Sequence, residues 1–297
     1  MKNPSPLVSI VIISFNHSKF ITDAMDSVIL QNYPNIELFL YDNYSSDNSV
    51  EIIKSHPKID EFKCVFNREN KGLISVLNDV LNKSKGEYFS ILAGDDVMLF
   101  DKTLKQVEFL ESNHIYYGCA GSQLKIDCNG NNLPQKQQNN LINSFKCIDK
   151  DYLFNHSNII YSPTAMYRLK TLIELGGYCD AIQIEDLYMF YKAAYNNLKI
   201  ALIPKVFVHY RIHGSNSHTK YDWMTDNKMK ILSEYKDTAD YKKLRDLIYM
   251  ESFYVLSKTN KKRAKGMFFD MVKIYLNNIT NKKSLYFYGG MFNLIFR

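Results

Sequence analysis

Apolar and polar residues follow one another in blocks that predict strands and helices in turn along most of the chain. Leu7–Ser14 is rich in β-branched residues and apolar on both faces, which is typical of a buried parallel strand. From Ser18 to Gln31 apolar residues recur at helical spacing, and Tyr33-Pro34-Asn35 ends that helix before a second strand at Ile36–Tyr41. The start of the chain therefore predicts a β-α-β unit.

The same alternation continues to about residue 210. Predicted helices cover Asp47–Lys54, Leu73–Lys83, Leu104–Glu111, Leu169–Leu175 and Ile184–Tyr195, and predicted strands cover Lys63–Phe66, Tyr88–Leu92, Tyr116–Ile126 and Lys199–Tyr210. We expect Gly176-Gly177 to end a helix, Pro204 to interrupt the last strand, and residues 129–143 to form a mobile loop. From Trp223 onward the pattern is mainly helical. Alternation of this kind predicts an α/β fold on an open, mostly parallel sheet with flanking helices.

The charge is unevenly distributed along the chain. Its net value is +6, with 21 basic and 23 acidic residues in 1–219 against 16 and 8 in 220–297. We therefore expect a catalytic domain over 1–219 and a basic, mainly helical C-terminal region over 220–297. The basic excess favours contact with phosphate, on nucleic acid or on an anionic bilayer, although a solvated helical face would explain it equally well.

The cysteines and the apolar runs set limits on the cellular location. The five cysteines are scattered and contain no Cys-x-x-Cys pair, so they indicate neither a zinc site nor a disulfide framework. The sequence has no charged-then-apolar leader and no run of eighteen apolar residues. We expect a cytoplasmic protein, either soluble or peripheral at the inner face of the cell membrane.

Two apolar runs end in carboxylates about fifty residues apart. The run Glu37 to Asp47 contains Asp42, and the run that begins at Ile91 ends in Asp95-Asp96. Ligands of α/β proteins bind beyond the carboxyl ends of parallel strands, so both acidic ends are expected to face one site. Acids that close to one another usually hold a metal ion and its phosphates. Capping of the next helix is the alternative for a single strand-end acid.

Several short motifs, taken in order and at their spacings, resemble one known family. They are Pro6–Asn16, Ser27–Pro34, Asp42–Asp47, Asn70–Leu73, Gly86–Tyr88, Gly94–Asp96, Ser162–Thr164, Gly176–Tyr178, Glu185-Asp186 and Tyr210–Gly214. Residues 6–218 resemble a family 2 glycosyltransferase of the bacterial cell-surface polysaccharide type. The resemblance implies the GT-A fold, which is Rossmann-like, followed here by a helical C-terminal appendage.

The resemblance implies a binding site for the sugar donor. Its nucleotide-binding residues would be Ser14, Asn16, Asp42, Asn70, Gly72 and Asp95. A carboxylate at Asp42 can accept the imide proton of uracil, which favours a UDP-linked donor. The family often has a second acid at the next position, where this chain has Asn43.

The resemblance also implies a divalent metal ion, Mn²⁺ or Mg²⁺. Asp95 and His213 match the metal ligands of the family, and the ion would bridge the diphosphate oxygens. The usual Asp-x-Asp triplet is incomplete, because Ala93 stands where its first acid would be. His209 and His218 are further candidates in the same C-terminal motif.

The remaining roles concern the acceptor. In the family the acid matching Asp186 is the general base, which removes the proton of the acceptor hydroxyl as that oxygen attacks the anomeric carbon. Asp96, Glu185 and Arg211 are placed around the base and the acceptor, and Arg211 could pair with phosphate. Stabilisation of a helix N-terminus would explain Glu185-Asp186 without any catalytic role.

The sequence therefore predicts an inverting glycosyltransferase that moves a sugar from a nucleoside diphosphate to a hydroxyl of a glycan acceptor, in O-antigen or capsule biosynthesis. The partners would be the nucleotide-sugar and a glycan, which a lipid would carry, and no nucleic acid is expected. A nicotinamide-dependent oxidoreductase is set aside, since Ser14 to Lys19 replaces the Gly-x-Gly-x-x-Gly turn. A catalytically inactive glycan- or nucleotide-binding protein on the same fold remains the alternative.

The C-terminal region carries a second candidate surface. The lysine cluster Lys261 to Lys265 precedes an amphipathic stretch, and Leu285 to Phe296 is apolar and aromatic. Aromatic residues beside lysines are typical of an interfacial membrane anchor. Packing of the same aromatic residues against a protein core is the alternative.

Overall fold

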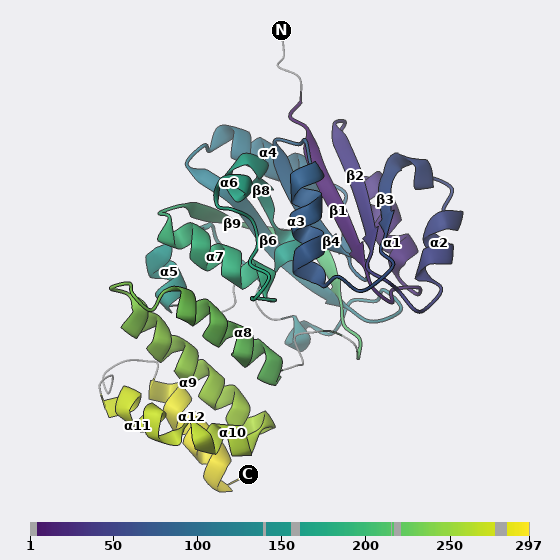
Figure 1. Ribbon diagram of the computed structural model, residues 1–297. Coiled ribbons are helices and arrows are strands. Elements are labelled where there is room, and N and C mark those ends of the chain that lie inside the picture. The colour runs from purple at the N-terminus through teal and green to yellow at the C-terminus, as the bar shows by residue number, and fades with distance from the viewer. Residues whose placement is uncertain are drawn as a thin grey trace. The chain divides into compact units, whose positions relative to one another are not determined.

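The computed structural model describes residues 5–138, 141–155, 161–214, 216, 221–276 and 284–296 (Figure 1). The chain divides into two compact units, Met1–Gly214 and Ser215–Arg297. We call them the sheet unit and the helical unit. The division falls a few residues before residue 219, after which the basic excess begins.

Four parallel strands form the first half of the sheet. β1 (Val8–Ser14) lies between β2 (Ile36–Asp42) and β4 (Tyr88–Ala93), and β3 (Phe62–Phe66) pairs with β2. All seven residues of β1 are buried, as expected for an apolar strand in the middle of a sheet covered on both faces. The predicted alternation of strands and helices is confirmed over this half.

The second half of the sheet is mixed, and it adds short antiparallel pairs to the mostly parallel sheet that the sequence predicts. The strand order is β3-β2-β1-β4-β8-β6-β9-β5, with β7 also paired to β9. Its strands are β5 (Val97–Met98), β6 (Tyr116–Ile126), β7 (Lys146–Ile148), β8 (Met166–Arg168) and β9 (Lys199–Arg211). Only β6 and β9 pair in parallel; β8 is antiparallel to β4 and β6, and β5 and β7 are antiparallel to β9. The three antiparallel strands have two or three residues each, too few to show a period.

The strand β9 corrects one expectation, because Pro204 does not interrupt it. β9 runs without a break from Lys199 to Arg211. The disturbance is limited to its register with β6, which shifts opposite the segment that contains Pro204. A bulge leaves this position unpaired, so proline, which has no backbone N–H to donate, is tolerated and the strand continues.

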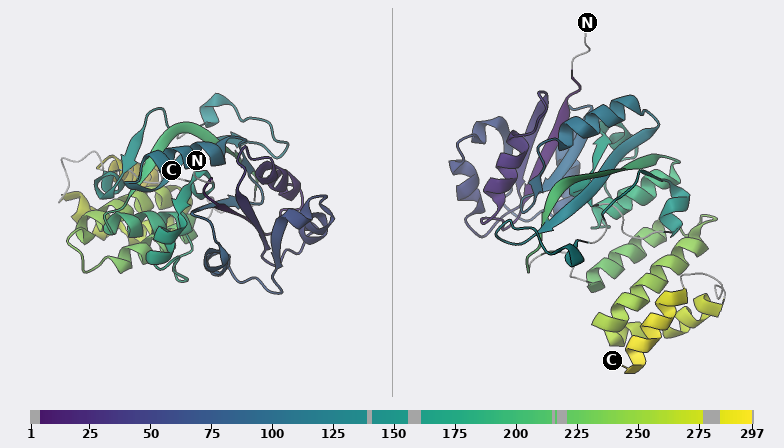
Figure 2. Two further views of the ribbon diagram at one scale, coloured as in Figure 1. Left: turned by 90° about the horizontal axis from the view of Figure 1, so that it is seen from above. Right: turned by 180° about the vertical axis from the view of Figure 1, so that it is seen from behind.

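Helices cover both faces of the sheet. They are α1 (Ile21–Ile29), α2 (Ser49–Ser55), α3 (Leu73–Lys83), α4 (Lys102–Ser112), α5 (Lys150–Asn155), α6 (Leu169–Glu174) and α7 (Glu185–Tyr195), with the 3₁₀ turns η1 (Ile59–Glu61), η2 (Gln135–Gln137) and η3 (Ser162–Thr164). Figure 1 shows α3 and α7 on the near face of the sheet, and the view from behind in Figure 2 shows α4 on the other face. The main core fills the space between them, and Ile10 and Ile12 are fully buried in it.

Glycine ends α6 as expected. Gly176 and Gly177 both adopt positive φ, 80° and 65°. Their N–H groups donate to the carbonyls of Ile173 and Leu172, which satisfies the last turn of the helix. The chain can then turn toward the start of α7.

The stretch 129–143 is more ordered than a mobile loop in its described part. Asn132 forms a β-bridge with Ile126, and η2 follows it. The Gln138 side chain bonds both the N–H and the carbonyl of Lys125, at 2.7 and 2.8 Å. Residues 139–140 lie outside the described residues.

The helical unit contains α8 (Tyr221–Glu234), α9 (Tyr241–Thr259), α10 (Lys261–Gly266), α11 (Phe268–Leu276) and α12 (Ser284–Phe296), as the sequence predicts. α12 packs closely on α9. A Cβ at Gly290 would lie 2.4 Å from the Phe253 ring, and Asn293 donates to Ser257 at 3.1 Å. Part of the C-terminal aromatic stretch is therefore core packing. In the described part of the chain, no helix combines the length and apolarity needed to cross a membrane.

Candidate active site

The register of the parallel strands brings the predicted strand-end residues to one edge of the sheet. Ser14 pairs with Asp42, and Ile13 pairs with Ala93. The pairing of β1 and β4 continues one residue further, because the Gly94 N–H donates to the Ile13 carbonyl at 2.9 Å. The acids at the ends of β2 and β4 consequently lie at the same edge of the sheet, as parallel topology requires.

Asp42 is buried at the end of β2 and is held by one serine. The Ser45 N–H and Oγ donate to the two carboxylate oxygens at 2.9 and 2.6 Å. Helix α2 begins later, with Asn48 as its N-cap and no side-chain cap bond. Capping of α2 therefore does not account for the Asp42 carboxylate.

Asn16 joins the loop after β1 to the loop after β2. Its N–H donates to Ser45 Oγ at 2.8 Å, and its own Oδ1 accepts from the Ser46 N–H at 2.8 Å. Asn16 adopts a left-handed φ of 58°, a conformation that asparagine tolerates better than most residues. Ser14 is fully buried, and its Oγ has no hydrogen-bond partner among the described residues.

Asn43 organises the loop that contains the predicted residues Asn70 and Gly72. Its Oδ1 accepts from Asn67 Nδ2 and the Lys71 N–H at 3.0 and 3.1 Å. Its Nδ2 donates to Asn70 Oδ1 at 3.0 Å, and that oxygen also accepts from the Gly72 N–H at 2.9 Å. An aspartate at residue 43 could accept but not donate, so an amide fits this network where the family often has an acid.

Asp95 lies between two histidines. His213 Nε2 is 2.8 Å from Asp95 Oδ2, and His17 Nε2 is 3.7 Å from the same oxygen. Burial alone would raise the pKa of Asp95, but the hydrogen bond to His213 and the charges of both imidazoles lower it. The carboxylate therefore stays ionised in the folded protein.

The sequence reasoning missed His17. Its Nδ1 is buried, and no hydrogen-bond partner for it lies among the described residues. A Cβ at position 94 would approach that nitrogen to 2.7 Å, so Gly94 leaves room for the ring. Gly94 in the acidic motif is the sequence signal for such a contact, because a glycine can mark a position where another group packs directly against the backbone.

Asp96 and Arg211 form a buried connection between β9 and the acidic motif. The Arg211 N–H donates to Asp96 Oδ1 at 3.0 Å, and its Nε donates to the Asp95 carbonyl at 2.9 Å. The guanidinium also bonds Asp23 at 2.9 Å and stacks on the Phe20 ring at 4.7 Å. Burial, and then the charge of Asp95, raise the pKa of Asp96 well above its ordinary value. These contacts favour a positioning role for Arg211; its predicted pairing with phosphate stays a prediction.

Glu185 and Asp186 begin α7. Burial raises the pKa of Asp186 to about 6, while hydrogen bonds from the Leu187 and Ser162 N–H groups oppose that rise. Burial and then the neighbouring Asp186 charge raise the pKa of Glu185 to about 8. At neutral pH the pair therefore holds one proton between its two carboxyl groups.

Tyr210 links the two acidic pairs. Burial raises its pKa first, and the charges of Asp96, Asp95 and Asp186 add to the effect. Carboxylates from the end of β4 and from the start of α7 therefore lie within electrostatic reach of one phenol. His209, the neighbouring candidate, has a pKa lowered by burial and then by Arg211, and His218 lies outside the described residues.

The donor chemistry fits a divalent metal ion at Asp95 and His213. A carboxylate oxygen and an imidazole nitrogen lie 2.8 Å apart, and both atom types bind Mn²⁺ well. Across the residues that the structure describes, no three histidine, cysteine or acidic side chains form a complete metal cage. The protein would then hold the ion by two side chains, with diphosphate oxygens and water completing its coordination.

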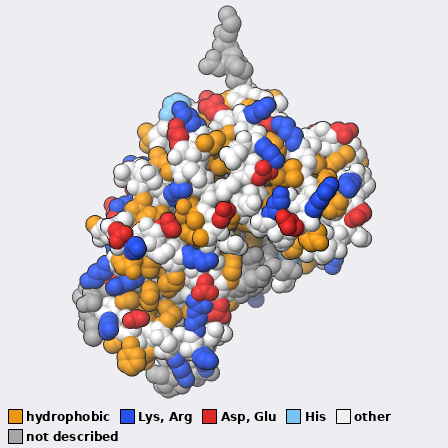
Figure 3. Space-filling model, viewed as in Figure 1, with side chains coloured by type: hydrophobic (Ala, Val, Ile, Leu, Met, Phe, Trp, Pro, Cys, Tyr) orange, Lys and Arg blue, Asp and Glu red, His pale blue; other side chains and the backbone are white. Residues whose placement is uncertain are grey.

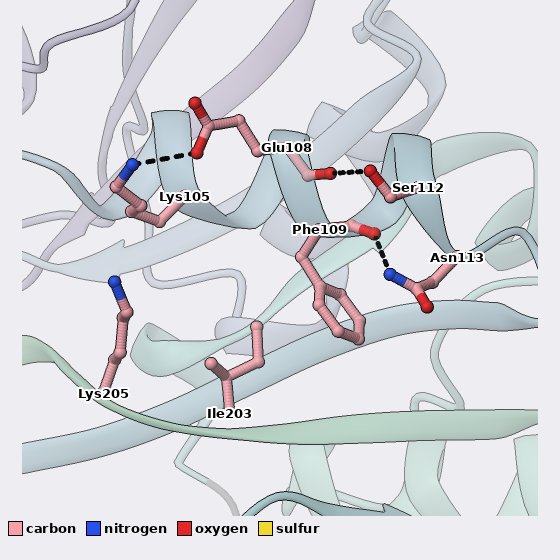
Figure 4. A pocket seen from close by; sticks show the side chains of 7 residues that line it. All are labelled: Lys105, Glu108, Phe109, Ser112, Asn113, Ile203 and Lys205. Atoms are coloured by element: carbon pink, nitrogen blue, oxygen red, sulfur yellow. Dashed lines mark hydrogen bonds and ion pairs between the residues drawn. The ribbon is translucent and has the colours of Figure 1, made fainter.

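A pocket of 340 Å³ lies away from these acids (Figure 4). Residues of α4, including Phe109 and the ion-paired Lys105 and Glu108, face Ile203 and Lys205 of β9 across it. None of the strand-end residues lines this pocket, so it does not belong to the candidate site.

Comparisons with known proteins agree with this arrangement. Residues 9–176 match the family model of Glycosyl transferase family 2. The putative teichuronic acid biosynthesis glycosyltransferase TuaG of Bacillus subtilis is 34% identical over 125 residues, which cover 42% of this chain and 50% of TuaG. The Escherichia coli enzyme WfaP, a UDP-Glc:alpha-D-GlcNAc-diphosphoundecaprenol beta-1,3-glucosyltransferase, is 30% identical over 121 residues, covering 41% of this chain and 48% of WfaP. The chain thus matches about half the length of each of these two relatives.

Solved structures share the fold. Staphylococcus aureus TarS in complex with UDP-GlcNAc superposes with a TM-score of 0.66 at 18% identity, covering 86% of this chain and 74% of the TarS chain. The mannosyltransferase PcManGT of Pyrobaculum calidifontis, in complex with GDP-Man and Mn²⁺, superposes with a TM-score of 0.63 at 15% identity, covering 99% and 88%. These likenesses confirm the predicted GT-A fold. Because the family model spans more than half of the chain, the protein belongs to glycosyl transferase family 2.

Proposed function

We propose that this protein is an inverting glycosyltransferase that moves a sugar from a nucleoside diphosphate, UDP by preference, to a hydroxyl of a glycan acceptor. The observation that carries the proposal is the gathering of three acidic groups in one region of a family 2 chain. Asp42 ends β2, Asp95 follows β4, and Asp186 lies in the first turn of α7, within electrostatic reach of the same tyrosine as Asp95.

The donor end of the site binds and orients the nucleotide. Ser45 fixes both oxygens of Asp42, so that the carboxylate can accept the imide N–H of uracil without a change of rotamer. Asp95 and His213 would hold a divalent ion that neutralises the diphosphate leaving group. The Asn43 network holds the loop that contains Asn70 to the end of β2.

The acceptor end supplies the base. Asp186 is ionised above pH 6 or so and can take the proton of the acceptor hydroxyl. The acceptor oxygen then bonds to the anomeric carbon while the bond from that carbon to the phosphate oxygen breaks, and the electron pair leaves with the diphosphate. Attack from the face opposite the leaving group inverts the anomeric configuration.

The biological setting is proposed from the relatives. TuaG is named for teichuronic acid biosynthesis, and the name of WfaP specifies an acceptor on diphosphoundecaprenol. We place this protein in cell-surface polysaccharide assembly, with a lipid-linked acceptor at the inner face of the cell membrane. Cytoplasmic nucleotide-sugars would supply its donor.

A peripheral membrane contact would fit that setting. Phe269, Tyr288 and Phe292 are more than half exposed in a helical unit with a basic excess. Figure 3 shows hydrophobic side chains gathered over this unit with lysines and arginines at their margin. Tyr288→Ser/Phe292→Ser should reduce sedimentation with phosphatidylglycerol vesicles and leave donor hydrolysis unchanged. Equal sedimentation of variant and wild type would remove the membrane contact from the proposal.

The decisive experiment measures transfer and donor binding together. The purified chain is screened against a panel of nucleotide-sugars with Mn²⁺, and the selected donor is then used with Asp186→Asn. We expect a loss of turnover of about two to four orders of magnitude, the range for losing a general base, with donor affinity unchanged. Near-normal transfer by this variant would rule out Asp186 as the base.

Ala93 favours a second candidate function. A chain without the first acid of the metal triplet could bind a nucleotide or a glycan and catalyse nothing. Slow hydrolysis of nucleotide-sugars by the wild type, lost in Asp186→Asn, would exclude this alternative, because a binding protein hydrolyses none.

A further inference from the structure

Tyr44 occupies a backbone conformation that bulky residues rarely adopt. Its φ is 71°, in the left-handed region. The other described residues with positive φ are glycines and asparagines, which tolerate this region much better: Asn16, Gly72, Gly130, Gly176, Gly177 and Asn197. Tyr44 is the one bulky side chain among them.

The turn explains the conformation but not the side chain. The left-handed residue directs the Ser45 N–H and Oγ back to the Asp42 carboxylate, at 2.9 and 2.6 Å. A glycine at position 44 would make the same turn without strain. The strain of a tyrosine there is therefore not required by the hydrogen bonds that the turn makes.

Packing does not explain the side chain either. Tyr44 is 55% exposed, so its ring buries little apolar surface in return for the strained backbone. Strained residues with no structural gain concentrate at sites where a ligand is bound. The ring follows Asp42 by two residues, and Phe15, 43% exposed, follows Ser14 on the neighbouring strand. Two exposed aromatic residues thus flank the strand ends where the nucleotide is proposed to bind.

We propose that Tyr44 is a specificity-determining residue of the donor site, whose ring stacks on the base of the nucleoside diphosphate. This inference rests on the proposed function, since it places the base beside Asp42. A base that donates its edge N–H to that carboxylate leaves its flat face open to a neighbouring ring. Stacking of a base on an aromatic side chain strengthens binding through the apolar face of both rings.

The test uses the full chain and two glycine substitutions. Tyr44→Gly removes the ring and relieves the strain together, so its Tm should stay equal or rise while its affinity for UDP falls roughly 5- to 100-fold. Asn197→Gly relieves a left-handed φ of 58° far from the strand ends in sequence and should leave UDP affinity unchanged. Tyr44→Phe keeps the ring and should bind UDP within about twofold of the wild type.

Three probes separate the outcomes by calorimetry. A ring that stacks on the base weakens UDP and UMP binding in Tyr44→Gly but leaves inorganic pyrophosphate binding unchanged. Equal UDP affinity in wild type and Tyr44→Gly overturns the inference. The inference is also overturned if Tyr44→Gly raises only the KM of the acceptor, since the ring would then contact the acceptor and not the base. A wild type that binds no nucleoside diphosphate at all overturns the proposed function itself, which is a different result.

Discussion

Replacing Glu185 by glutamine tests the charge state of the acidic pair at the start of α7. The pKa of Glu185 is raised from its ordinary value of 4.5 to about 8, by burial first and by Asp186 second. A carboxyl group with a raised folded-state pKa contributes stability that is fully present below pH 4.5 and is lost as the pH rises to about 8. Glutamine has the shape of the protonated acid at every pH, so Glu185→Gln should not show this loss.

The size of the effect follows from the change in proton affinity. Each tenfold change in proton affinity corresponds to about 1.4 kcal/mol. The complete rise of the Glu185 pKa from 4.5 to about 8 would therefore amount to roughly 4–5 kcal/mol. The Glu185 side chain is partly exposed, and solvent reduces such interactions, so we expect about 2 kcal/mol. For a unit of this size, that corresponds to a Tm difference of roughly 4–8 °C.

Thermal unfolding of both proteins between pH 5 and pH 9, at constant ionic strength, provides the measurement. The Tm of Glu185→Gln relative to the wild type should increase up to about pH 8 and level off above it. Groups that are not coupled to residue 185 cancel in the difference. Glu174→Gln removes an exposed glutamate from α6 and should give a constant difference. If the Glu185→Gln difference were also the same at pH 5 and pH 9, the carboxyl would be ionised throughout and the proposed division of roles within the pair would be wrong.

Three further substitutions test other parts of the site and core. Asp95→Ala should abolish metal-dependent activity. Mn²⁺ should bind the nucleotide-free wild type only weakly, because only two side chains hold the ion. Calorimetry that gives micromolar Mn²⁺ affinity without nucleotide would contradict this. Asn43→Asp cannot donate to Asn70 and should raise the Kd for UDP roughly three- to tenfold at neutral pH, whereas an unchanged Kd would show that the amide network is not needed. Lys102 is buried, and burial lowers its pKa to about 7, so wild-type stability should rise with pH between about 7 and 10. Lys102→Met should flatten that rise in urea titrations, and an unchanged slope would mean that the amine stays charged.

The sequence predicted elements best where a period was long and its ends were marked. The predicted bounds of α3 and β6 agree with the structure residue for residue. The strands β5, β7 and β8 and the helix α5 were missed, because two to six residues cannot reveal a period of 2 or 3.6. Antiparallel pairing of such short strands depends on contacts distant in sequence, which no local pattern records.

The strand-end acids of the candidate site could be placed from sequence because parallel topology brings strand ends together. The groups around them could not. His17 approaches Asp95 from a loop almost eighty residues earlier, and Asn43 bonds Asn70 across 27 residues. The C-terminal aromatic stretch also needed the structure, since Phe287 stacks on Phe253 whereas the next residue, Tyr288, is 55% exposed.

Arg211 has a consequence for the order in which the protein acquires its site during synthesis. Its side chain bonds Asp23 across 188 residues and the Asp95 carbonyl across 116, and its N–H donates to one carboxylate oxygen of the buried Asp96. Contacts between such distant residues form late, because the chain between them must first be ordered. A nascent chain emerging from the ribosome can complete β1 to β4 early, but its acidic motif lacks these partners until β9 has been made. The acidic site is therefore assembled only after almost all of the sheet unit has been translated.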